Sequence, residues 1–462
     1  MTTASSAARD FDAIVIGSGQ AGNPLAHRLA DKGWRVALIE REHMGGSCVN
    51  YGCTPTKTMI ASSQIVYEAK RGAKLGVNIP EVSVDLPLIV ARKNEIVRQW
   101  RSGQEKQAAS RPNITVFHGS ARFSGSRQVA VLGEELRADH IFINTGTSPF
   151  IPPISGLADV PFLTNRTILD ISVVPEHLAI LGGSYIGLEF GQMFRRFGSR
   201  VTVIESGDQI VGREDEDVAA ALRTSLEAEG IVFLTGQDAQ SVTSSAAGIR
   251  IAVRDRAGTT TTVECSQLLV AVGRVPNTSD LDLAATGVRT DRGFVPVNEY
   301  LETNVKGVYA LGDVNGGAAF THISYNDFQI AFHNLFNDVK RSTAGRIIPY
   351  ALFTDPELGR VGMTERQARL SGRPILVGSI PMGRVARAIE RGDTRGLMKV
   401  IVDAETEQLL GAAILGQGGG ELVQTLMALM MAGASWKTFY QAVYIHPTMT
   451  EGFFALMDSV KP

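Results

Sequence analysis

Two stretches of the chain repeat one order of hydrophobic and polar positions. Residues 11–17 are an apolar run that leads into a glycine-rich turn, a mixed stretch to about Lys32 and a second apolar run at 34–40. The same order begins again at 177–183, about 165 residues later, and closes at 199–205. An apolar strand, a turn, a helix and a second apolar strand form a βαβ unit. The repeat predicts two nucleotide-type α/β folds in one chain.

Two similar segments lie where the chain is expected to leave each of these folds, and a further domain follows them. These segments are residues 138–149 (ADHIFINTGTSP) and 265–277 (CSQLLVAVGRVPN), each after a β-rich stretch. From Gly345 onward, strand candidates such as 397–403 precede a helix rich in Met and Leu at 422–433. We therefore predict a separate C-terminal domain.

The length and composition fit a soluble protein of about three domains. The chain has 462 residues, of which 44% are apolar and 20% charged, and one domain takes roughly 150 residues. The longest apolar run, residues 426–434, has nine residues, whereas a membrane span needs roughly 18. The N-terminus lacks the basic start and apolar core of a signal peptide. We predict no membrane partner and a cytoplasmic location.

Charge and cysteine content exclude two further classes of protein. Lys and Arg number 45 and Asp and Glu 47, for a formal net charge of −2. Because no basic tract suits a phosphate backbone, nucleic acid is not a predicted partner. The three cysteines, Cys48, Cys53 and Cys265, are too few for a disulfide scaffold, so their role must be local. Cys265 has no partner in sequence and is most simply a small core residue.

The first glycine-rich turn has the spacing of a dinucleotide-binding site. Gly17, Gly19 and Gly22 lie between the first apolar strand and the helix, and Glu40 ends the next strand. In such turns the glycines allow a tight bend and close approach of backbone N–H groups to a pyrophosphate, and the acid accepts hydrogen bonds from a ribose. The alternative is a plain glycine-rich turn. The strand, helix and acid in register favour a nucleotide site.

The second turn has nearly the same pattern. Gly182, Gly183 and Gly187 are followed by Glu205, eighteen residues after the last glycine. Ser184 stands where the middle glycine belongs, a departure because serine has a Cβ. The carboxylate of Glu205 favours a free ribose 2′-hydroxyl over a 2′-phosphate. The predicted coenzyme is NADH, with NADPH as the alternative.

A cysteine pair lies a few residues after the first turn. Cys48 and Cys53 are spaced C-x4-C, and five residues of regular helix rise about 7.5 Å, more than the roughly 4.4 to 6.8 Å between Cα atoms of a disulfide. Gly52 and Pro55 supply an irregular turn, and a bridge in so small a loop should be readily reducible. Lys57 and a helix N-terminus after Cys53 would favour a thiolate. The alternative is two buried cytosolic thiols.

With these features the chain resembles the FAD-dependent pyridine nucleotide-disulfide oxidoreductases, such as dihydrolipoamide dehydrogenase, glutathione reductase and mercuric reductase. The resemblance covers nearly the whole chain. It rests on the motifs GGSCVNYGCTPTK, NTGTSP, VAVGRVPN, TNVKGVYALGDV, FTDPELGRVGMTE and YIHPTMTE. It implies the α/β class, with two Rossmann-like nucleotide-binding domains, for FAD and NAD(P), plus a C-terminal α+β dimerisation domain.

The same resemblance implies how these domains divide the chain. The FAD-binding domain would take residues 1–150 and, after an insertion, 278–344. The inserted NAD(P)-binding domain would take 151–277, and the interface domain 345–462.

The resemblance also implies which residues hold the cofactors, FAD in the first turn and NADH or NADPH in the second. The predicted FAD contacts are Gly17, Gly19, Gly22, Glu40, Gly46, Ser47, Lys57, Ala121, Thr145, Gly146, Gly312 and Asp313. The predicted coenzyme contacts are Gly182, Gly183, Gly187, Glu205 and Gly273. No resident metal is predicted.

The implied chemistry passes electrons from the nicotinamide to the flavin and then to the disulfide. Cys53 would be the charge-transfer thiolate beside the flavin, and Cys48 the interchange thiol that attacks the substrate. Lys57 would pair with Glu189 near the flavin. Tyr185 would gate the nicotinamide pocket, and its spacing of four from Glu189 puts both on one helical face.

A histidine near the C-terminus completes the implied site. His446 alone would more often be an ordinary satisfied histidine. In the motif YIHPTMTE, Glu451 is placed to orient the imidazole for acid–base exchange with thiols. The resemblance implies that this pair serves the disulfide of the other subunit, so a homodimer is predicted.

The electron acceptor stays open at this point. Segments such as GGSYIGLEF resemble mercuric reductase, but those enzymes carry a C-terminal cysteine pair and this chain has no cysteine after Cys265. Efficient Hg(II) turnover is therefore not expected. A small disulfide, a reactive oxidant of thiols, a quinone or a slowly reduced metal ion is expected instead. Arg384 and Arg387 suggest an anionic or polar substrate, or simply a solvated basic stretch.

Two other functions compete with this prediction. Dihydrolipoamide dehydrogenase shares the cysteine spacing, the His-Glu pair and the acid at Glu205, although Tyr51 and Thr54 differ from its usual small or aliphatic residues. A non-catalytic FAD-binding redox sensor or scaffold is the alternative of another class. A scaffold needs neither a coenzyme turn nor Lys57 and Glu189 together, which favours the enzyme.

Overall fold

The computed structural model describes residues 8–246 and 248–461. These residues form two compact units, each assembled from separate stretches of chain. The first contains the described residues up to Thr56, then Ala91–Phe150 and Gly273–Arg346. The second contains Lys57–Val90, Ile151–Val272 and the described residues from Ile347 onward.

The first unit is built on a seven-stranded sheet. Its order is β3 (Ile114–His118), β2 (Val36–Glu40), β1 (Arg9–Ile16), β6 (Glu134–Ile143), β5 (Gln128–Val131) and β4 (Arg122–Gly125), with β16 (Val308–Ala310) beside β6. Strands β3, β2, β1, β6 and β16 are parallel, and β5 and β4 are antiparallel additions. All five residues of β2 are buried, as expected for a parallel strand covered on both faces.

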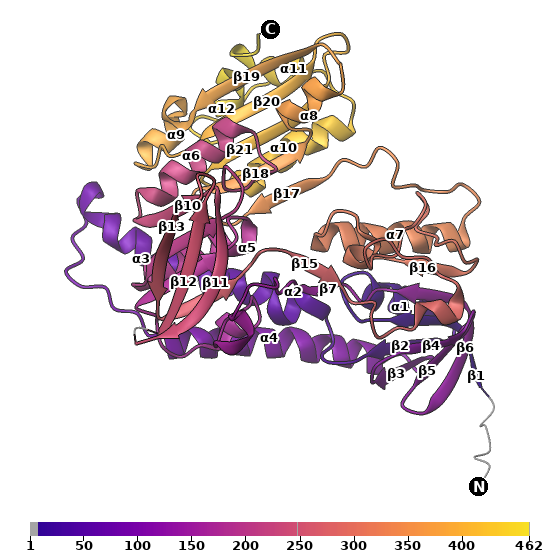
Figure 1. Ribbon diagram of the computed structural model, residues 1–462. Helices are drawn as coiled ribbons and strands as arrows, with labels where there is room; N and C mark the ends of the chain where they lie inside the picture. The colour runs from indigo at the N-terminus through magenta and orange to yellow at the C-terminus, as the bar shows by residue number, and fades with distance from the viewer. Residues whose placement is uncertain (1–7, 247, 462) are drawn as a thin grey trace. The chain divides into compact units, whose positions relative to one another are not determined.

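Helices of the first unit flank this sheet. They are α1 (Gly22–Asp31), α2 (Gly46–Tyr51), α7 (Thr321–Phe336) and the 3-10 helices η4 (Leu283–Thr286) and η5 (Gly312–Asn315). Helix α1 packs against α7 and the sheet, as the view in Figure 1 shows. A two-stranded ribbon, β7 (Thr147–Pro149) with β15 (Arg274–Pro276), closes the unit.

The second unit begins with a smaller α/β fold. A four-stranded parallel sheet has the order β10 (Ile231–Thr235), β9 (Arg200–Glu205), β8 (His177–Leu181) and β14 (Gln267–Val270). A three-stranded antiparallel sheet follows the order β11 (Gln237–Ser245), β12 (Gly248–Asp255) and β13 (Thr260–Cys265). The helices are α5 (Tyr185–Phe197), α6 (Glu216–Glu227) and the 3-10 helices η1 (Gly72–Leu75), η2 (Leu157–Asp159) and η3 (Thr167–Asp170).

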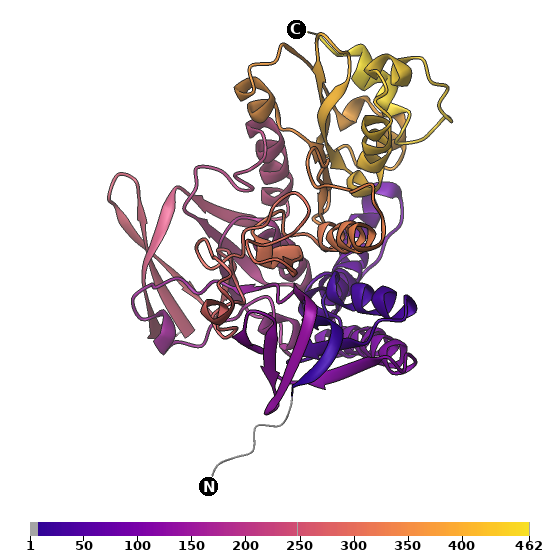
Figure 2. The same ribbon diagram turned by 90° about the vertical axis from the view of Figure 1, so that its right-hand side faces the viewer.

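The C-terminal part of the second unit is an antiparallel sheet covered by helices. The sheet order is β17 (Pro349–Leu352), β18 (Glu357–Gly362), β21 (Leu409–Gly416), β20 (Leu397–Asp403) and β19 (Ile375–Pro381). The helices are α8 (Glu365–Leu370), η6 (Met382–Arg384), α9 (Ala386–Glu390), α10 (Gly419–Met431), α11 (Trp436–Tyr440) and α12 (Gly452–Asp458). Figure 2 shows the yellow C-terminal helices beside this sheet, where α10 contacts β18 and β21.

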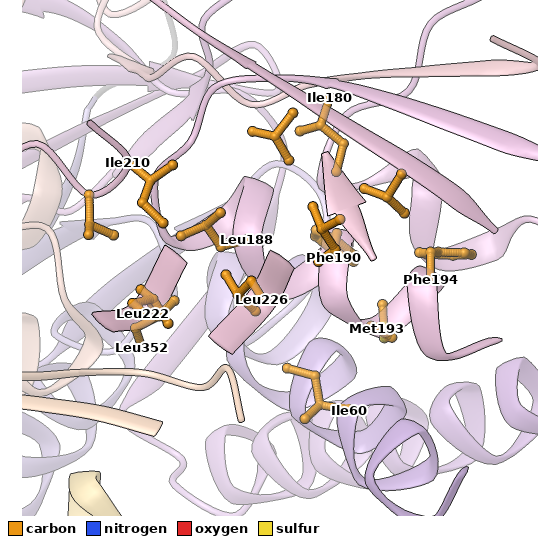
Figure 3. Packing of buried hydrophobic residues seen from close by; sticks show 14 of the residues in the cluster. Ile60, Ile180, Leu188, Phe190, Met193, Phe194, Ile210, Leu222, Leu226 and Leu352 are labelled. Carbon is orange, nitrogen blue, oxygen red and sulfur yellow. The ribbon is translucent and has the colours of Figure 1, made fainter. Parts of the chain in front are cut away.

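Two long helices, α3 (Cys53–Arg71) and α4 (Leu86–Ala109), carry the chain between the units. In the second unit, α3 contributes Ile60 to a cluster that also contains Ile180 of β8 and Leu352 of β17. Figure 3 shows these side chains with Phe190 and Phe194 of α5. Phe194 is fully buried, and burying a phenylalanine stabilises a fold by roughly 1.5–3 kcal/mol.

Buried ion pairs also join the α/β fold of the second unit to the C-terminal sheet. The Arg360 side chain is fully buried, and its Nη2 lies 2.6 Å from Glu214 and 3.2 Å from Asp215. Arg196 of α5 likewise lies 2.8 Å from Asp355. These contacts explain why the two parts form one compact unit.

The predicted fold class is confirmed: both units contain the expected parallel α/β sheets, and a C-terminal α+β part follows. The predicted division at 150, 277 and 344 stays a prediction. The chain passes between units after Thr56, Val90, Phe150, Val272 and Arg346. Within the described ranges, no helix is both long and apolar enough to cross a bilayer.

Candidate functional site

The first glycine-rich turn joins β1 to α1 and leaves no room for side chains. Gly17 has a φ of +101°, and a Cβ there would lie 2.3 Å from the Asn144 carbonyl oxygen. A Cβ on Gly22 would lie 2.0 Å from the Gly17 carbonyl oxygen. Asn144, at the end of β6, accepts a hydrogen bond from Gly22 N at 2.8 Å. The turn is therefore held tightly over the carboxyl ends of the strands, where parallel sheets bind ligands.

The predicted acid stands beside this turn. Glu40 ends β2 and is buried. Its Oε2 accepts hydrogen bonds from Ser18 N at 3.0 Å and Ser18 Oγ at 2.6 Å. Ser18 was not predicted, because it lies at a variable position of the glycine pattern. The carboxylate is thus fixed at the end of β2, as a ribose-binding acid requires.

The cysteine loop packs onto the same turn through Gly46. A Cβ on Gly46 would lie 2.7 Å from Gly19 Cα, and Gly46 has a φ of +61°. Ser47 follows and is exposed. Only a glycine allows this contact, since the neighbouring atom is backbone. The loop that carries the cysteines is therefore seated against the predicted pyrophosphate site.

The two cysteines lie on consecutive helices rather than on one. Cys48 is in α2 and Cys53 begins α3, with Gly52 between them at φ −130° and ψ −114°. The Cys48 thiol has a raised pKa, chiefly because of its hydrogen bond with Cys53 and then because of burial. Cys53 Sγ lies 3.1 Å from Thr321 Oγ1. The structure therefore brings Cys48, Cys53 and Thr321 together, and Thr321 was not predicted.

Asn50, between the two cysteines, fixes their loop. Its Nδ2 donates to the carbonyl oxygens of Met44 at 3.0 Å and Gly46 at 2.9 Å. Its Oδ1 accepts a hydrogen bond from Arg101 Nε at 3.0 Å. A buried amide with donors and acceptor all used holds a loop rigidly. The sequence placed Asn50 inside a motif but gave no signal for this role.

Polar groups around β6 and η5 suit a bound dinucleotide. Thr145 Oγ1 is buried and, among the described residues, has no hydrogen-bond partner. Burial raises the pKa of the Asp313 carboxyl, which accepts a hydrogen bond from Thr147 Oγ1 at 3.1 Å. Arg274 Nε donates in turn to Thr147 Oγ1 at 2.7 Å. An orphan hydroxyl and a desolvated carboxyl need polar partners, and the hydroxyls and amides of FAD would supply them.

Other predicted cofactor residues occupy turns. Gly146, Gly273 and Gly312 have φ values of +64°, +141° and +72°, in the region that favours glycine. Gly312 N donates to Asp327 Oδ2 at 2.9 Å. Ala121 is buried in a hydrophobic cluster of the first unit. Their contacts with FAD or the coenzyme stay predictions.

The second glycine-rich turn joins β8 to α5 with the same geometry. A Cβ on Gly182 would lie 2.4 Å from the Ala271 carbonyl oxygen, and one on Gly187 would lie 2.0 Å from the Gly182 carbonyl oxygen. Glu205 Oε2 accepts a hydrogen bond from Gly183 N at 2.6 Å. Ser184 is exposed and has an ordinary φ of −106°, so a serine fits the backbone conformation of this position.

Lys57 and Glu189 are in contact within the second unit. Lys57 Nζ lies 2.6 Å from Glu189 Oε2, and the Glu189 side chain is 8% exposed. The other oxygen, Oε1, accepts a hydrogen bond from Phe353 N at 3.0 Å. Lys57 Nζ is also 4.6 Å from the centroid of the Phe353 ring, a cation–π distance. Phe353 was not predicted.

Tyr185 begins α5, at the mouth of the second turn. Burial raises the pKa of its hydroxyl. Its ring meets that of Tyr350 edge-on, with centroids 6.0 Å apart, and the Tyr350 hydroxyl contacts Glu214. Tyr185 therefore has a supported place beside the coenzyme turn. Its gating role stays a prediction.

His446 and Glu451 form the predicted pair. His446 Nδ1 lies 2.9 Å from both Glu451 oxygens, and the His446 side chain is 67% exposed. Arg387 pairs with Glu390 at 3.1 Å, and Arg384 is exposed in η6. The carboxylate fixes the imidazole through Nδ1, and the role of His446 in acid–base exchange with a thiol stays a prediction.

The third cysteine, Cys265, is a core residue. It is buried at the end of β13, and burial raises its thiol pKa to about 11. Among residues 8–246 and 248–461, no group of three or more His, Cys, Asp and Glu side chains is placed to hold a metal ion.

Two sequence models match the chain. The pyridine nucleotide-disulphide oxidoreductase family matches residues 11–328, and the dimerisation domain of pyridine nucleotide-disulphide oxidoreductases matches residues 348–456. Together they span nearly all of the chain.

Curated relatives match over their full length or most of it. A probable pyridine nucleotide-disulfide oxidoreductase, RclA of Escherichia coli, is 36% identical over 98% of this chain and 99% of its own. A mercuric reductase of Staphylococcus aureus is 32% identical over 96% of this chain and 81% of its own. A dihydrolipoyl dehydrogenase of Thermus scotoductus is 33% identical over 98% of both.

A solved structure is also similar. It is the HOCl-induced flavoprotein disulfide reductase RclA from Escherichia coli, with a TM-score of 0.88 and 36% identity, covering 97% of this chain and 100% of that one. A Cu(II) complex of the same protein has the same TM-score.

Proposed function

The chain belongs to the pyridine nucleotide-disulphide oxidoreductase family, and from that premise we propose that it is an NADH-dependent reductase of small oxidised-sulfur compounds. It is an enzyme that uses FAD and NAD(P)H. One observation carries the proposal: the loop of Cys48 and Cys53 is seated on the first glycine-rich turn through the contact of Gly46 with Gly19. A redox pair placed there lies beside a bound dinucleotide.

The residues of the first unit fit FAD. Gly17, Gly19 and Gly22 would hold its pyrophosphate, Glu40 its ribose, and Asp313 its ribityl chain. When bound, FAD supplies a two-electron connection between NAD(P)H and a disulfide. The chain itself supplies the binding, the orientation and the thiols.

The coenzyme is proposed to be NADH. The Glu205 carboxylate is held by Gly183 N at 2.6 Å and Gly207 N at 2.7 Å. A carboxylate fixed in this way can accept hydrogen bonds from a ribose 2′-hydroxyl but repels a 2′-phosphate. Gly182, Gly187 and Gly273 would form the rest of the coenzyme turn.

The cysteine pair would carry out the exchange with the acceptor. The Cys48–Cys53 disulfide takes two electrons and two protons to give two thiols. Deprotonated Cys48 then attacks the sulfur of an acceptor R–S–X and forms a mixed disulfide, and X⁻ leaves. Cys53 attacks Cys48 Sγ, restores the disulfide and releases RS⁻, so that the two electrons end on the acceptor.

The acceptor class is proposed from chemistry and from relatives. A dithiol reduces compounds with electrophilic sulfur, such as small disulfides and products of thiol oxidation. RclA, 36% identical over 98% of this chain, is described as an HOCl-induced disulfide reductase. Because RclA also forms a Cu(II) complex, Cu(II) belongs among the acceptors to be tested.

Dihydrolipoyl dehydrogenase is the second candidate. The Thermus scotoductus enzyme is 33% identical over 98% of both chains. The His446–Glu451 pair suits either reaction, because both need a base near a thiol.

The active form is proposed to be a homodimer, which the match to the dimerisation domain supports. His446 is 67% exposed, although Glu451 fixes its ring. An oriented imidazole that faces outward is suited to act on the cysteine pair of a second copy. We also propose that the division at residues 150, 277 and 344 separates the FAD, NAD(P) and interface domains.

Turnover with a set of acceptors tests this proposal. NADH oxidation by the purified holoenzyme is measured with a methyl thiosulfonate, glutathione disulfide, lipoamide, Hg(II) and Cu(II). The proposal expects kcat/KM for the thiosulfonate or glutathione disulfide to exceed that for lipoamide at least about tenfold. A preference for lipoamide would establish the second candidate instead.

A matched pair of cysteine variants provides the control. Cys48→Ser should lose turnover of sulfur acceptors, whereas Cys265→Ser, which changes a buried core cysteine, should keep it. Full turnover of a sulfur acceptor by Cys48→Ser would contradict the proposal, because the thiol proposed to form the mixed disulfide would be gone.

A further inference from the structure

The hydroxyl of Thr321 contacts the sulfur of Cys53, although the two residues are far apart in the sequence. Its Oγ1 lies 3.1 Å from Cys53 Sγ, and the two residues are 268 positions apart. Both sulfurs of the pair are involved, because a hydrogen bond with Thr321 also lowers the pKa of the Cys48 thiol, against the larger effects of Cys53 and burial. A single hydroxyl therefore interacts with both cysteine sulfurs, which are the atoms that the proposed reaction oxidises and reduces.

Helix α7 does not need this hydroxyl for its own stability. The cap of α7 is Phe320, and Ile323 N and Ser324 N close the first turn by donating to the Phe320 carbonyl oxygen. Thr364 shows the usual alternative, since its hydroxyl accepts a hydrogen bond from Gln367 N at 3.1 Å and caps α8. The Thr321 hydroxyl points to sulfur instead.

The surroundings favour negative charge at Cys53. Thr321 is the first residue of the 16-residue helix α7, and Cys53 is the first residue of α3. Helix N-termini favour anions, and thiols near them are more easily deprotonated. Cys53 favours the protonated form of Cys48, because their hydrogen bond is the largest cause of the raised Cys48 pKa. One thiolate and one thiol is thus the expected reduced state.

We propose that Thr321 is a catalytic residue whose hydroxyl donates a hydrogen bond to the Cys53 thiolate and so stabilises the reduced form of the cysteine pair. This inference rests on the proposed function, since it concerns the same dithiol. The hydroxyl loses its charged acceptor when the disulfide forms, so it favours reduction by the coenzyme. Hydrogen bonds to charged groups are the strong ones.

The test measures the equilibrium between disulfide and dithiol. Holoenzymes with Thr321, Thr321→Val and Thr321→Ser are equilibrated in glutathione buffers of varied redox ratio at pH 7. Thiols are then trapped by alkylation and counted at Cys48 and Cys53 by mass spectrometry. Valine keeps the shape of threonine but removes the hydroxyl, and serine restores it.

The inference expects Thr321→Val to shift the equilibrium about tenfold toward the disulfide, which corresponds to about 30 mV for a two-electron couple. Thr321→Ser should lie within about twofold of the unchanged chain. Equal midpoints for Thr321 and Thr321→Val would overturn the inference while leaving the proposed function intact. Failure of the unchanged chain to form a Cys48–Cys53 disulfide in any buffer would overturn both.

Discussion

Removal of the Lys57 ammonium tests how the buried Glu189 carboxylate of the second unit is stabilised. Lys57→Met keeps the length of the side chain and deletes its charge. Glu189, whose side chain is 8% exposed, would then keep, from the described part of the chain, only the hydrogen bond from Phe353 N at 3.0 Å. A buried carboxylate with one of its two donors removed is an uncompensated charge.

The expected change in the free energy of unfolding follows from the exposed fractions of the Lys57 and Glu189 side chains. Removing one partner of a fully buried pair costs about 3–5 kcal/mol, but the Lys57 side chain is 33% exposed, so water screens part of the interaction. We expect Lys57→Met to lower the free energy of unfolding by about 2–3 kcal/mol. Glu189→Gln leaves a lysine that can reach water, so its cost should be smaller, about 1 kcal/mol.

Urea unfolding of the holoenzyme gives these differences, and hydrogen exchange at the Phe353 amide gives a local measure. Equal costs for the two variants would refute the reasoning.

Three other predictions concern the two glycine-rich turns and acid stability. Gly22→Ala should lose bound FAD, seen as loss of flavin absorbance after purification, because its Cβ would lie 2.0 Å from the Gly17 carbonyl oxygen; retained flavin would contradict the tight turn. Glu205→Gln should raise the ratio of kcat/KM for NADPH to that for NADH about tenfold, since the charge that repels a 2′-phosphate is gone; an unchanged ratio would contradict it. Burial lowers the pKa of His27 from 6.5 to about 4, so the unfolded chain binds a proton that the folded chain does not, and stability falls as the pH drops from 6.5 toward 4. His27→Gln should flatten this slope in thermal unfolding between pH 7 and 4.5, and the exposed His118→Gln should not; equal slopes would exclude the assignment.

Local patterns in the sequence were enough to predict the turns and the sheets that carry them. Gly17, Gly22 and Glu40 act within one βαβ unit, so their spacing along the chain fixes their spacing in space. The same holds for Gly182 and Glu205. The contact of Lys57 with Glu189 was reached through family resemblance, because 132 residues separate the two positions.

Contacts that depend on tertiary packing were missed. Thr321 meets Cys53 only because α7 and the cysteine loop converge in the folded first unit, and no periodicity in the sequence reports this. Phe353 contributes a backbone N–H to Glu189, and any residue but proline could do so. Asn50 lay inside the recognised motif, but its partners are the backbone carbonyls of His43, Met44 and Gly46 and the side chain of Arg101, which lies outside the motif.

The central claim is that electrons from the coenzyme reach the Cys48–Cys53 pair, and a thiol count tests it most directly. The oxidised holoenzyme is treated anaerobically with one equivalent of NADH per chain, and new thiols are alkylated and located by mass spectrometry. The account predicts two new thiols per NADH, at Cys48 and Cys53, with the labelling of Cys265 unchanged. Oxidation of NADH with no new thiol at either position would contradict it.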